Sequence, residues 1–148
     1  MSFNSYSISS FKDYEPINEW LANQLGKYPI VALTGDLGSG KTTFIQQFCE
    51  SHFDIDEVSS PTYAIINVYQ GYSDNGNLEV THVDLYRLND LEEALEIGME
   101  DVLESSEPVF IEWPELIEPL LGSFIHIHLE ASPASGRQIS LRVVNDQT

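Results

Sequence analysis

The segment Val31–Phe48, VALTGDLGSGKTTFIQQF, constrains the fold more than any other part of this 148-residue chain. A short apolar run leads into a glycine-rich stretch, and a pattern typical of an amphipathic helix follows. The Gly-x-x-x-x-Gly-Lys-Thr spacing from Gly35 to Thr42 matches a phosphate-binding loop in the strand–loop–helix context that such loops require. We therefore expect an α/β fold whose loop binds the phosphates of a nucleoside triphosphate.

Each part of this loop has a physical role in binding phosphate. Glycines allow backbone conformations closed to other residues, so that successive N–H groups point at phosphate oxygens, and the helix that follows adds its positive end. Lys41 is expected to reach the β- and γ-phosphates, and the Thr42 hydroxyl is expected to bind Mg²⁺. The expected nucleotide contacts in this segment are Gly35, Asp36, Leu37, Gly38, Ser39, Gly40, Lys41, Thr42 and Thr43.

Three residues outside the loop are candidates for chemistry at the γ-phosphate. Glu112 ends the apolar run Val109–Glu112, a position from which an acid can hold Mg²⁺ directly or through water. Asp84, in THVDLY, is placed to orient or activate an attacking water. Ordinary surface carboxylates are the alternative for both. Thr62, in SSPTY, is either a threonine near the γ-phosphate or a turn hydroxyl, and its spacing favours the turn.

The sequence partly constrains which nucleotide the loop binds and which kind of partner the protein has. No Asn-Lys-x-Asp stretch of the kind that a Ras-type GTPase needs is present, which favours ATP over GTP. Six Lys and Arg against 24 Asp and Glu give a formal net charge of −18. This charge disfavours direct binding to DNA or RNA, because such affinity comes largely from basic side chains. The acidity indicates either a solvated surface or docking to a basic partner protein.

The remaining features indicate a protein of the cytoplasm. The single cysteine, Cys49, rules out a disulfide within the chain, and its apolar helical position predicts that it lies in the core. The N-terminal residues lack the features of a signal peptide. No apolar run approaches the roughly 18 residues of a membrane span. We therefore expect a soluble cytoplasmic protein without membrane association.

Periodicity along residues 1–148 predicts a single-domain α/β fold of the P-loop NTPase type, with a mixed parallel and antiparallel sheet flanked by helices. The expected helical segments are Glu15–Gly26, Thr42–Ser51, a helix from Asn89 or Asp90 to Gly98, Glu100–Glu104 and Pro114–Leu121. The expected strands are Tyr28–Thr34, Thr62–Gln70, Leu78–Leu85, Pro108–Glu112, Phe124–Glu130 and Gln138–Val144. The Asn75-Gly76 pair favours a primed hairpin turn between the second and third strands, and the last two strands form another hairpin.

Five segments carry a resemblance to a known family. GDLGSGKTTF, SSPTYAIINVY, THVDLYRL, EALEIGMEDV and IEWPE occur in this order between about residue 30 and residue 115. Together they resemble the TsaE (YjeE) family, the small P-loop ATPases of bacterial tRNA threonylcarbamoyladenosine formation. The combination of DLYRL and EWPE with a phosphate-binding loop is specific to that family.

The resemblance implies a Mg²⁺-dependent ATPase that is weak in isolation and works with a TsaB–TsaD pair. In this pair TsaD transfers a threonylcarbamoyl group to the adenosine beside the anticodon of tRNAs that read codons beginning with A. ATP hydrolysis would reset the assembly between turnovers. The chain would meet tRNA only through its partners, with no direct contact to DNA.

The resemblance also implies roles for particular residues. Lys41 would bind phosphates, Thr42 and Glu112 would bind Mg²⁺, and Asp84 would be the catalytic acid. Thr62, Trp113 and Gly136 would belong to the active site, with Trp113 and Gly136 near the nucleotide. Phe11 either stacks on the adenine or is a core aromatic, and the core position is favoured.

Two other functions use the same loop. A small-molecule kinase would need an acceptor pocket and an arginine-bearing lid, and the sequence shows no lid-like insertion. A nucleotide-sensing module would bind ATP without useful hydrolysis.

Among the histidines, His126 and His128 have the spacing of metal ligands but lack an evident third ligand. His82 is placed either to bond Asp84 or to be satisfied within its strand.

Overall fold

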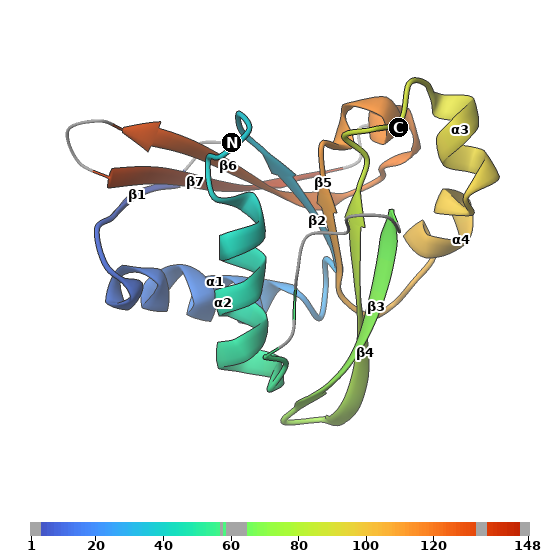
Figure 1. The fold of residues 1–148 in the computed structure, drawn as a ribbon. Helices are drawn as coiled ribbons and strands as arrows, with labels where there is room; N and C mark the ends of the chain where they lie inside the picture. Colours follow the sequence, from blue (N-terminus) through green and yellow to red (C-terminus); the bar gives the residue numbers. More distant parts are fainter. Residues whose placement is uncertain (1–3, 57, 59–64, 133–135, 146–148) are drawn as a thin grey trace.

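The computed structural model describes residues 4–56, 58, 65–132 and 136–145. These residues form a mixed seven-stranded sheet with the strand order β1-β7-β6-β2-β5-β4-β3 (Figure 1). The strands are β1 (Asn4–Ile8), β2 (Ile30–Thr34), β3 (Ile66–Ser73), β4 (Gly76–Asp84), β5 (Val109–Glu112), β6 (Phe124–Ser132) and β7 (Gly136–Val144). The α-helices are α1 (Glu15–Gln24), α2 (Lys41–Phe53), α3 (Leu91–Glu96) and α4 (Met99–Leu103), and the 3₁₀ helices are η1 (Phe11–Tyr14) and η2 (Pro114–Leu120).

The centre of the sheet is parallel and its margins are antiparallel. β2 pairs in parallel with both β5 and β6, and β4 pairs in parallel with β5. β7 and β1 extend one margin in antiparallel fashion, and β3 extends the other. This arrangement confirms the expected mixed sheet. Because the central strands are parallel, their carboxyl ends meet at one edge, where ligands of open α/β sheets bind.

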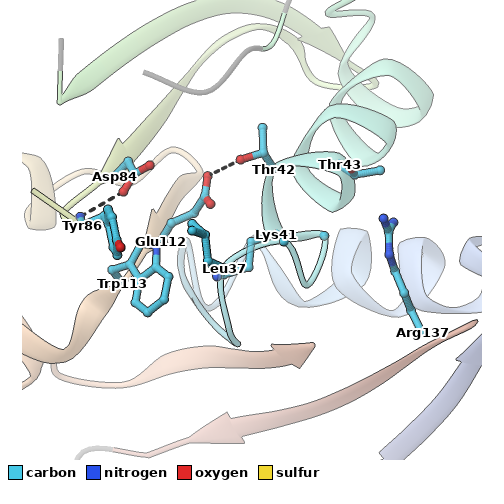
Figure 2. Close-up of a pocket in the computed structure, with 11 residues that line it drawn as sticks. Leu37, Lys41, Thr42, Thr43, Asp84, Tyr86, Glu112, Trp113 and Arg137 are labelled. Carbon is cyan, nitrogen blue, oxygen red and sulfur yellow. Dashed lines mark hydrogen bonds between the residues drawn. The ribbon is translucent and has the colours of Figure 1, made fainter. Parts of the chain in front are cut away.

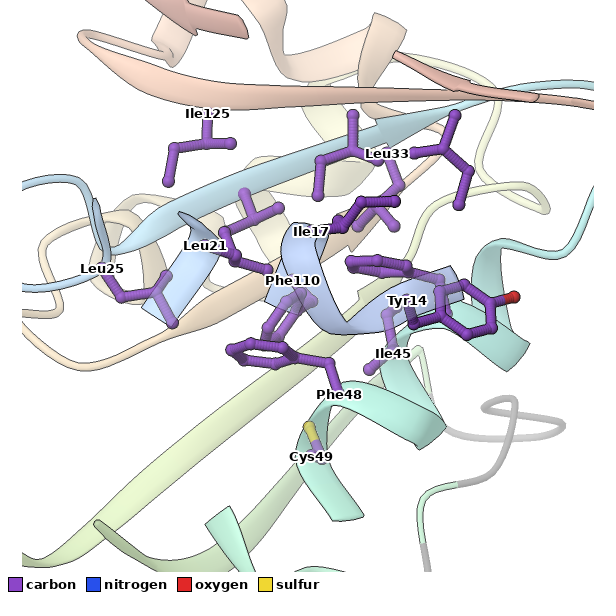
Figure 3. Packing of buried hydrophobic residues seen from close by; sticks show 14 of the residues in the cluster. Tyr14, Ile17, Leu21, Leu25, Leu33, Ile45, Phe48, Cys49, Phe110 and Ile125 are labelled. Atoms are coloured by element: carbon purple, nitrogen blue, oxygen red, sulfur yellow. The ribbon is translucent and has the colours of Figure 1, made fainter. Parts of the chain in front are cut away.

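Two apolar clusters pack against the two faces of this sheet. Helices α1 and α2 cover one face, where Leu21, Phe48 and Phe110 are fully buried (Figure 3). Cys49 lies in the same cluster and is fully buried, as expected. A second cluster, which includes Met99 of α4, packs on the other face beneath α3, α4 and η2. None of the helices in the described part of the chain is long and apolar enough to cross a bilayer.

The β3–β4 hairpin forms as expected, but its turn differs from the prediction. Asp74 and Asn75 are the turn residues between the paired Ser73 and Gly76. A primed turn needs positive φ at its central residues. Gly76 has φ +109°, whereas the only non-glycine residues with positive φ in the described part of the chain are Asp54 and Trp113. The left-handed residue therefore follows the turn, and the prediction of a primed turn was wrong.

The sequence patterns predicted neither strand β1 nor the 3₁₀ helix η1. Strand β1 has the sequence NSYSI, which contains few apolar residues, and Tyr6 and Ile8 alternate with polar side chains over a very short length. It pairs with β7 in antiparallel register, from Asn4 opposite Leu141 to Ile8 opposite Arg137. The 3₁₀ helix η1, which begins at Phe11, follows β1 and lies near the first turn of α2, where the rings of Tyr14 and Phe44 are in contact. The N-terminal segment therefore contributes to the site described next.

Candidate functional site

The glycine-rich loop connects the carboxyl end of β2 to the first turn of α2. Gly35, Gly38 and Gly40 all have positive φ, at +143°, +81° and +105°. A Cβ on Gly35 would collide with the carbonyl oxygen of Leu129, and a Cβ on Gly40 would lie 2.9 Å from the guanidinium of Arg137. The backbone conformation favours glycine at both positions, and at Gly35 the contact with a backbone atom excludes a side chain as well. The loop therefore folds as the spacing predicts.

Lys41 is folded back over this loop. Its side chain is buried, and its Nζ donates hydrogen bonds to the carbonyl oxygens of Gly35, at 2.6 Å, and Asp36, at 3.1 Å. The same ammonium lies 4.1 Å from the ring centroid of Trp113. Burial lowers the pKa of Lys41, and the negative charge of Glu112 opposes this shift. The ammonium is thus held inside the space that the loop encloses.

Glu112 is the buried carboxylate of the site. It ends β5 in register with Asp84 at the end of β4, so that both acids stand at the carboxyl edge of the sheet. Its Oε2 accepts a hydrogen bond from the Thr42 hydroxyl at 2.9 Å and lies 2.6 Å from His82 Nε2. Glu112 is only 3% exposed and His82 is fully buried. The carboxylate is therefore fixed in orientation from two sides.

His82 contacts Glu112 and not Asp84. Positions 82 and 84 share a strand face, but the imidazole reaches across to the neighbouring strand β5. Its other nitrogen, Nδ1, is buried without a hydrogen-bond partner among the described residues. Because Nε2 faces a carboxylate, the proton of a neutral ring belongs on Nε2. His82 thus acts as a positioning group for Glu112, a role that its sequence position alone did not indicate.

Asp84 lies at the mouth of the site and is half-buried. Its Oδ1 accepts a hydrogen bond from the backbone N–H of Tyr86 at 3.0 Å. Burial raises the pKa of Asp84, and the negative charge of Glu112 adds to the rise, while the Tyr86 hydrogen bond opposes it. A carboxylate with a raised pKa is a stronger proton acceptor than an ordinary aspartate. Its place and its environment suit a group that orients a water molecule.

A pocket of about 390 Å³ brings these side chains together (Figure 2). Its lining residues are Leu37, Gly38, Gly40, Lys41, Thr42, Thr43, Asp84, Tyr86, Glu112, Trp113 and Arg137. Trp113 has a left-handed backbone, with φ 58° and ψ 59°, which places its ring against Tyr86 and Lys41. A non-glycine residue in this conformation is typical of functional sites.

A second pocket, of about 600 Å³, adjoins the first. Phe11 and Gly136 line it, and Thr43 and Arg137 line both pockets. Phe11 is 73% exposed, so the favoured expectation of a core aromatic was wrong. Gly136 has φ +81°, and a Cβ there would lie 2.5 Å from the carbonyl oxygen of Ile8. The second pocket is thus formed where β1 and β7 meet.

The structure gathers most of the expected site residues around these two pockets. Gly35, Asp36 and Ser39 belong to the loop but do not line the first pocket, and Ser39 Oγ is buried without a partner among the described residues. Thr62 lies outside the described residues. Sequence reasoning did not place Tyr86 or Arg137 in the site. The only available signals were their positions beside Asp84 and Gly136.

The donor atoms at Thr42 and Glu112 fit a magnesium ion. A hydroxyl and a carboxylate oxygen stand 2.9 Å apart, and Mg²⁺ prefers hard oxygen donors, with one or two carboxylates from the protein. Among the described residues, His82 lies within ion-pair distance of Glu112, but a neutral imidazole carries no charge, so a bound cation would compensate the buried negative charge. No group of three or more His, Cys, Asp or Glu within the described ranges could enclose a metal.

His126 and His128 form hydrogen bonds with neighbouring side chains of the sheet. Both rings hydrogen-bond to the hydroxyl of Thr34, at 2.8 Å from His126 Nε2 and 2.7 Å from His128 Nδ1. Arg142 Nε donates to the remaining nitrogen of His126 at 3.1 Å. The pair therefore belongs to a hydrogen-bonded network on the sheet face, among the residues that the structure describes.

Comparison with known proteins identifies the family of the chain. The sequence profile named "Threonylcarbamoyl adenosine biosynthesis protein TsaE" matches residues 8–139. The chain belongs to the TsaE family. It is 35% identical over 141 residues to the TsaE protein of Rickettsia conorii, covering 92% of this chain and 76% of that protein. It is 32% identical over 145 residues to the TsaE protein of Rickettsia typhi, covering 95% of each.

Another TsaE relative and a solved structure come from Bacillus subtilis. The B. subtilis TsaE protein is 37% identical over 119 residues, covering 80% of this chain and 72% of that protein. The crystal structure of B. subtilis YdiB superposes with a TM-score of 0.70 at 24% identity, covering 95% of this chain and 84% of that one. This likeness supports the same α/β fold. The TsaE relatives are named for the biosynthesis of tRNA threonylcarbamoyladenosine.

Proposed function

We propose that this TsaE protein is a Mg²⁺-dependent ATPase. The observation that carries the proposal is the convergence of Lys41, Thr42, Glu112 and Asp84 on one pocket at the carboxyl edge of the sheet. A cation, a metal-binding hydroxyl, a buried acid and a proton acceptor are the parts that phosphoryl transfer to water requires. The sequence lacks the guanine-recognition stretch of Ras-type GTPases, so ATP is the proposed substrate.

Each side chain has a defined role in the proposed reaction. Lys41 exchanges the carbonyl oxygens of Gly35 and Asp36 for the β- and γ-phosphate oxygens. Thr42 and Glu112 would hold Mg²⁺, and the ion would supply positive charge that stabilises the negative charge of the phosphates. Asp84 aligns a water molecule for in-line attack and accepts its proton, which the raised pKa of this carboxyl favours.

The second pocket is the proposed site for adenine. It adjoins the phosphate pocket through Thr43, and the exposed ring of Phe11 offers an aromatic face for stacking. Gly136 allows β7 to approach the segment at Ile8 closely enough to form the pocket wall. The exposed ring therefore favours the alternative in which Phe11 stacks on the base over the one in which it is a core aromatic.

The partner is proposed to be a TsaB–TsaD-like pair that modifies tRNA in the cytoplasm. The names of the relatives place the family in tRNA threonylcarbamoyladenosine biosynthesis. The charge of −18 disfavours direct binding of tRNA by this chain, so the partner would carry most of the RNA contact. ATP hydrolysis would then reset the modifying complex between turnovers.

Replacing the proposed water-orienting acid tests this function. The Asp84→Ala variant should bind ATP as tightly as the wild-type protein but lose hydrolysis by roughly 10²–10⁴-fold, because the proton acceptor is gone. The measurement is ATP binding by calorimetry and phosphate release, with and without a purified TsaB–TsaD pair, together with tRNA modification.

Asp74→Ala is the matched control, since Asp74 lies in the β3–β4 turn, at the opposite end of β4 from Asp84. This control should hydrolyse ATP normally. Unchanged hydrolysis by Asp84→Ala would contradict the role of Asp84. A wild-type protein that shows no heat of binding with MgATP would contradict the proposed function as a whole.

A further inference from the structure

Arg137 lies at the boundary between the two pockets. It is the second residue of β7, and with Thr43 it lines both the phosphate pocket and the pocket of Phe11. In Figure 2 its side chain rises from β7 toward the first turn of α2, beyond Thr43 and away from Asp84. Three guanidinium atoms, Nε, Cζ and one terminal nitrogen, are each 2.9 Å from the Cβ position of Gly40. The group therefore lies flat against the loop.

The charge of Arg137 has no protein partner in the described part of the chain. Neither an ion pair nor a hydrogen bond involves its guanidinium there, although the sequence contains 24 Asp and Glu. An arginine on so acidic a protein would ordinarily pair with a carboxylate. A guanidinium that stays unpaired beside a glycine-rich loop presents its donors to an anion, and its planar fork matches the geometry of phosphate oxygens.

The order of groups along a nucleotide decides which phosphate Arg137 meets. With the γ-phosphate at Asp84 and Glu112 and the base at Phe11, the sugar and the α-phosphate occupy the boundary that Thr43 and Arg137 share. We propose that Arg137 is a nucleotide-binding residue that contacts the α-phosphate and thereby joins the phosphate pocket to the base pocket. This inference rests on the proposed function, because it assumes that the two pockets hold one nucleotide.

A contact to the α-phosphate has a different signature from a contact to the γ-phosphate. ADP and ATP share the α-phosphate, so Arg137→Ala should weaken both by a similar factor, roughly 10–100-fold for a charge-assisted hydrogen bond. Arg137→Lys keeps the charge but loses the planar fork, and should recover part of the loss. The kcat for ATP at saturation should change little.

The experiment measures Kd for ATP and ADP by calorimetry, and kcat for ATP, in the wild-type protein and both variants. Lys27→Ala is the matched control, because it removes one exposed positive charge at the far end of α1 from the site. Thermal unfolding followed by circular dichroism confirms that each variant is folded. The control should bind ATP and ADP as the wild-type protein does.

Three results would overturn the inference. A loss for ATP alone, or a fall in kcat with unchanged Kd, would place Arg137 at the γ-phosphate. An equal loss in Arg137→Lys and Arg137→Ala would show that the charge is not the contact. Unchanged binding in both variants would exclude any contact. If the wild-type protein itself does not bind ATP or ADP, the proposed function fails, which is a different outcome from these three.

Discussion

At the scale of single residues, the most informative group is the buried carboxylate of Glu112. A charge in a buried position is costly unless hydrogen bonds or counter-charges compensate it. Here Thr42 and His82 converge on the same oxygen, Oε2, and Lys41 is turned toward backbone carbonyls of the loop. The carboxylate of Glu112 is therefore held in one orientation. The neighbouring side chains leave part of its negative charge uncompensated, and this favours a bound divalent cation.

Removing the imidazole that positions Glu112 should weaken the response to magnesium. For His82→Ala we expect the Mg²⁺ concentration at half-maximal hydrolysis to rise roughly 10–100-fold, because loss of an orienting partner typically costs a metal site that much. Nucleotide binding measured in EDTA should not change. The measurement is the rate of ATP hydrolysis at constant ATP as the MgCl₂ concentration is increased.

His82→Gln is the matched variant, because its amide can donate to the same carboxylate oxygen and should restore part of the Mg²⁺ response. Circular dichroism shows whether each protein is folded. If His82→Ala responds to magnesium as the wild-type protein does, the imidazole serves packing and not the orientation of Glu112.

At the scale of elements, hydrogen bonds between residues of β2, β6 and β7 indicate which ring nitrogen of His126 and of His128 carries the proton when the ring is neutral. Arg142 Nε donates to His126 Nδ1, so the ring proton of neutral His126 is on Nε2 and is donated to Thr34. The Thr34 hydroxyl then donates to His128 Nδ1, and His128 Nε2 donates to Glu130 at 3.0 Å. Each group in this series thus donates to the next, from Arg142 to Glu130, and the residues come from β7, β6 and β2.

Protonation of His126 should oppose folding. Burial lowers the pKa of His126 from 6.5 to about 4, and the nearby Arg142 charge adds to the shift. The unfolded chain therefore binds the extra proton first, so the contribution of His126 to stability is full above pH 6.5 and is lost as the pH falls toward about 4. NMR titration should show His126 neutral, with the proton on Nε2, at pH 5.5.

The variant His126→Gln should lose less thermal stability than the wild-type protein between pH 6.5 and pH 5, by roughly 2–4 °C if the difference is about 1 kcal/mol. Both proteins contain the same carboxylates, so the difference between them isolates the imidazole. A midpoint near 6.5 in the NMR titration would contradict the expected shift.

Local patterns predicted the elements better than they predicted the contacts between them. The phosphate-binding loop and the capped helix at Asp90 follow from spacings of a few residues, and Asp90 Oδ1 accepts the Glu93 N–H at 2.9 Å. The contact of His82 with Glu112 depends on strand register across two elements, and the approach of Arg137 to Gly40 depends on the whole sheet order. Such long-range placements have no periodic signature in a single sequence.

At the scale of the whole molecule, the two apolar clusters enclose every central strand. Helices α1 and α2 cover one face, and α3, α4 and η2 cover part of the other. Cys49 lies in the larger cluster with 0% exposure, and burial raises the pKa of its thiol to about 12. A thiol in that state reacts only when the core opens, because the thiolate is the nucleophile.

The reactivity of Cys49 should therefore report global unfolding. At pH 8 the native protein should react with an aromatic disulfide reagent at least about 1,000-fold more slowly than the urea-unfolded protein, as expected for a group exposed only by global opening. Saturating MgATP should slow the native reaction further, because ligand binding stabilises the folded state.

Cys49→Ser provides the blank for this assay, since the chain has a single cysteine. Comparable rates for native and unfolded protein would show that the core around α2 opens locally. Slowing by MgATP without slowing by ADP would show that the stabilisation requires the γ-phosphate.

The meeting of β1 with β7 has a consequence for how the protein is made. Phe11 and Arg137 line the same pocket, and Gly136 closes against Ile8, so one wall of the base site is assembled from early and late parts of the polypeptide. During synthesis the N-terminal part of the chain emerges first. A nascent chain that already displays its glycine-rich loop still lacks this wall until the last hairpin leaves the ribosome. Tight capture of nucleotide should accordingly begin only after β6 and β7 have been synthesised and have paired with β1.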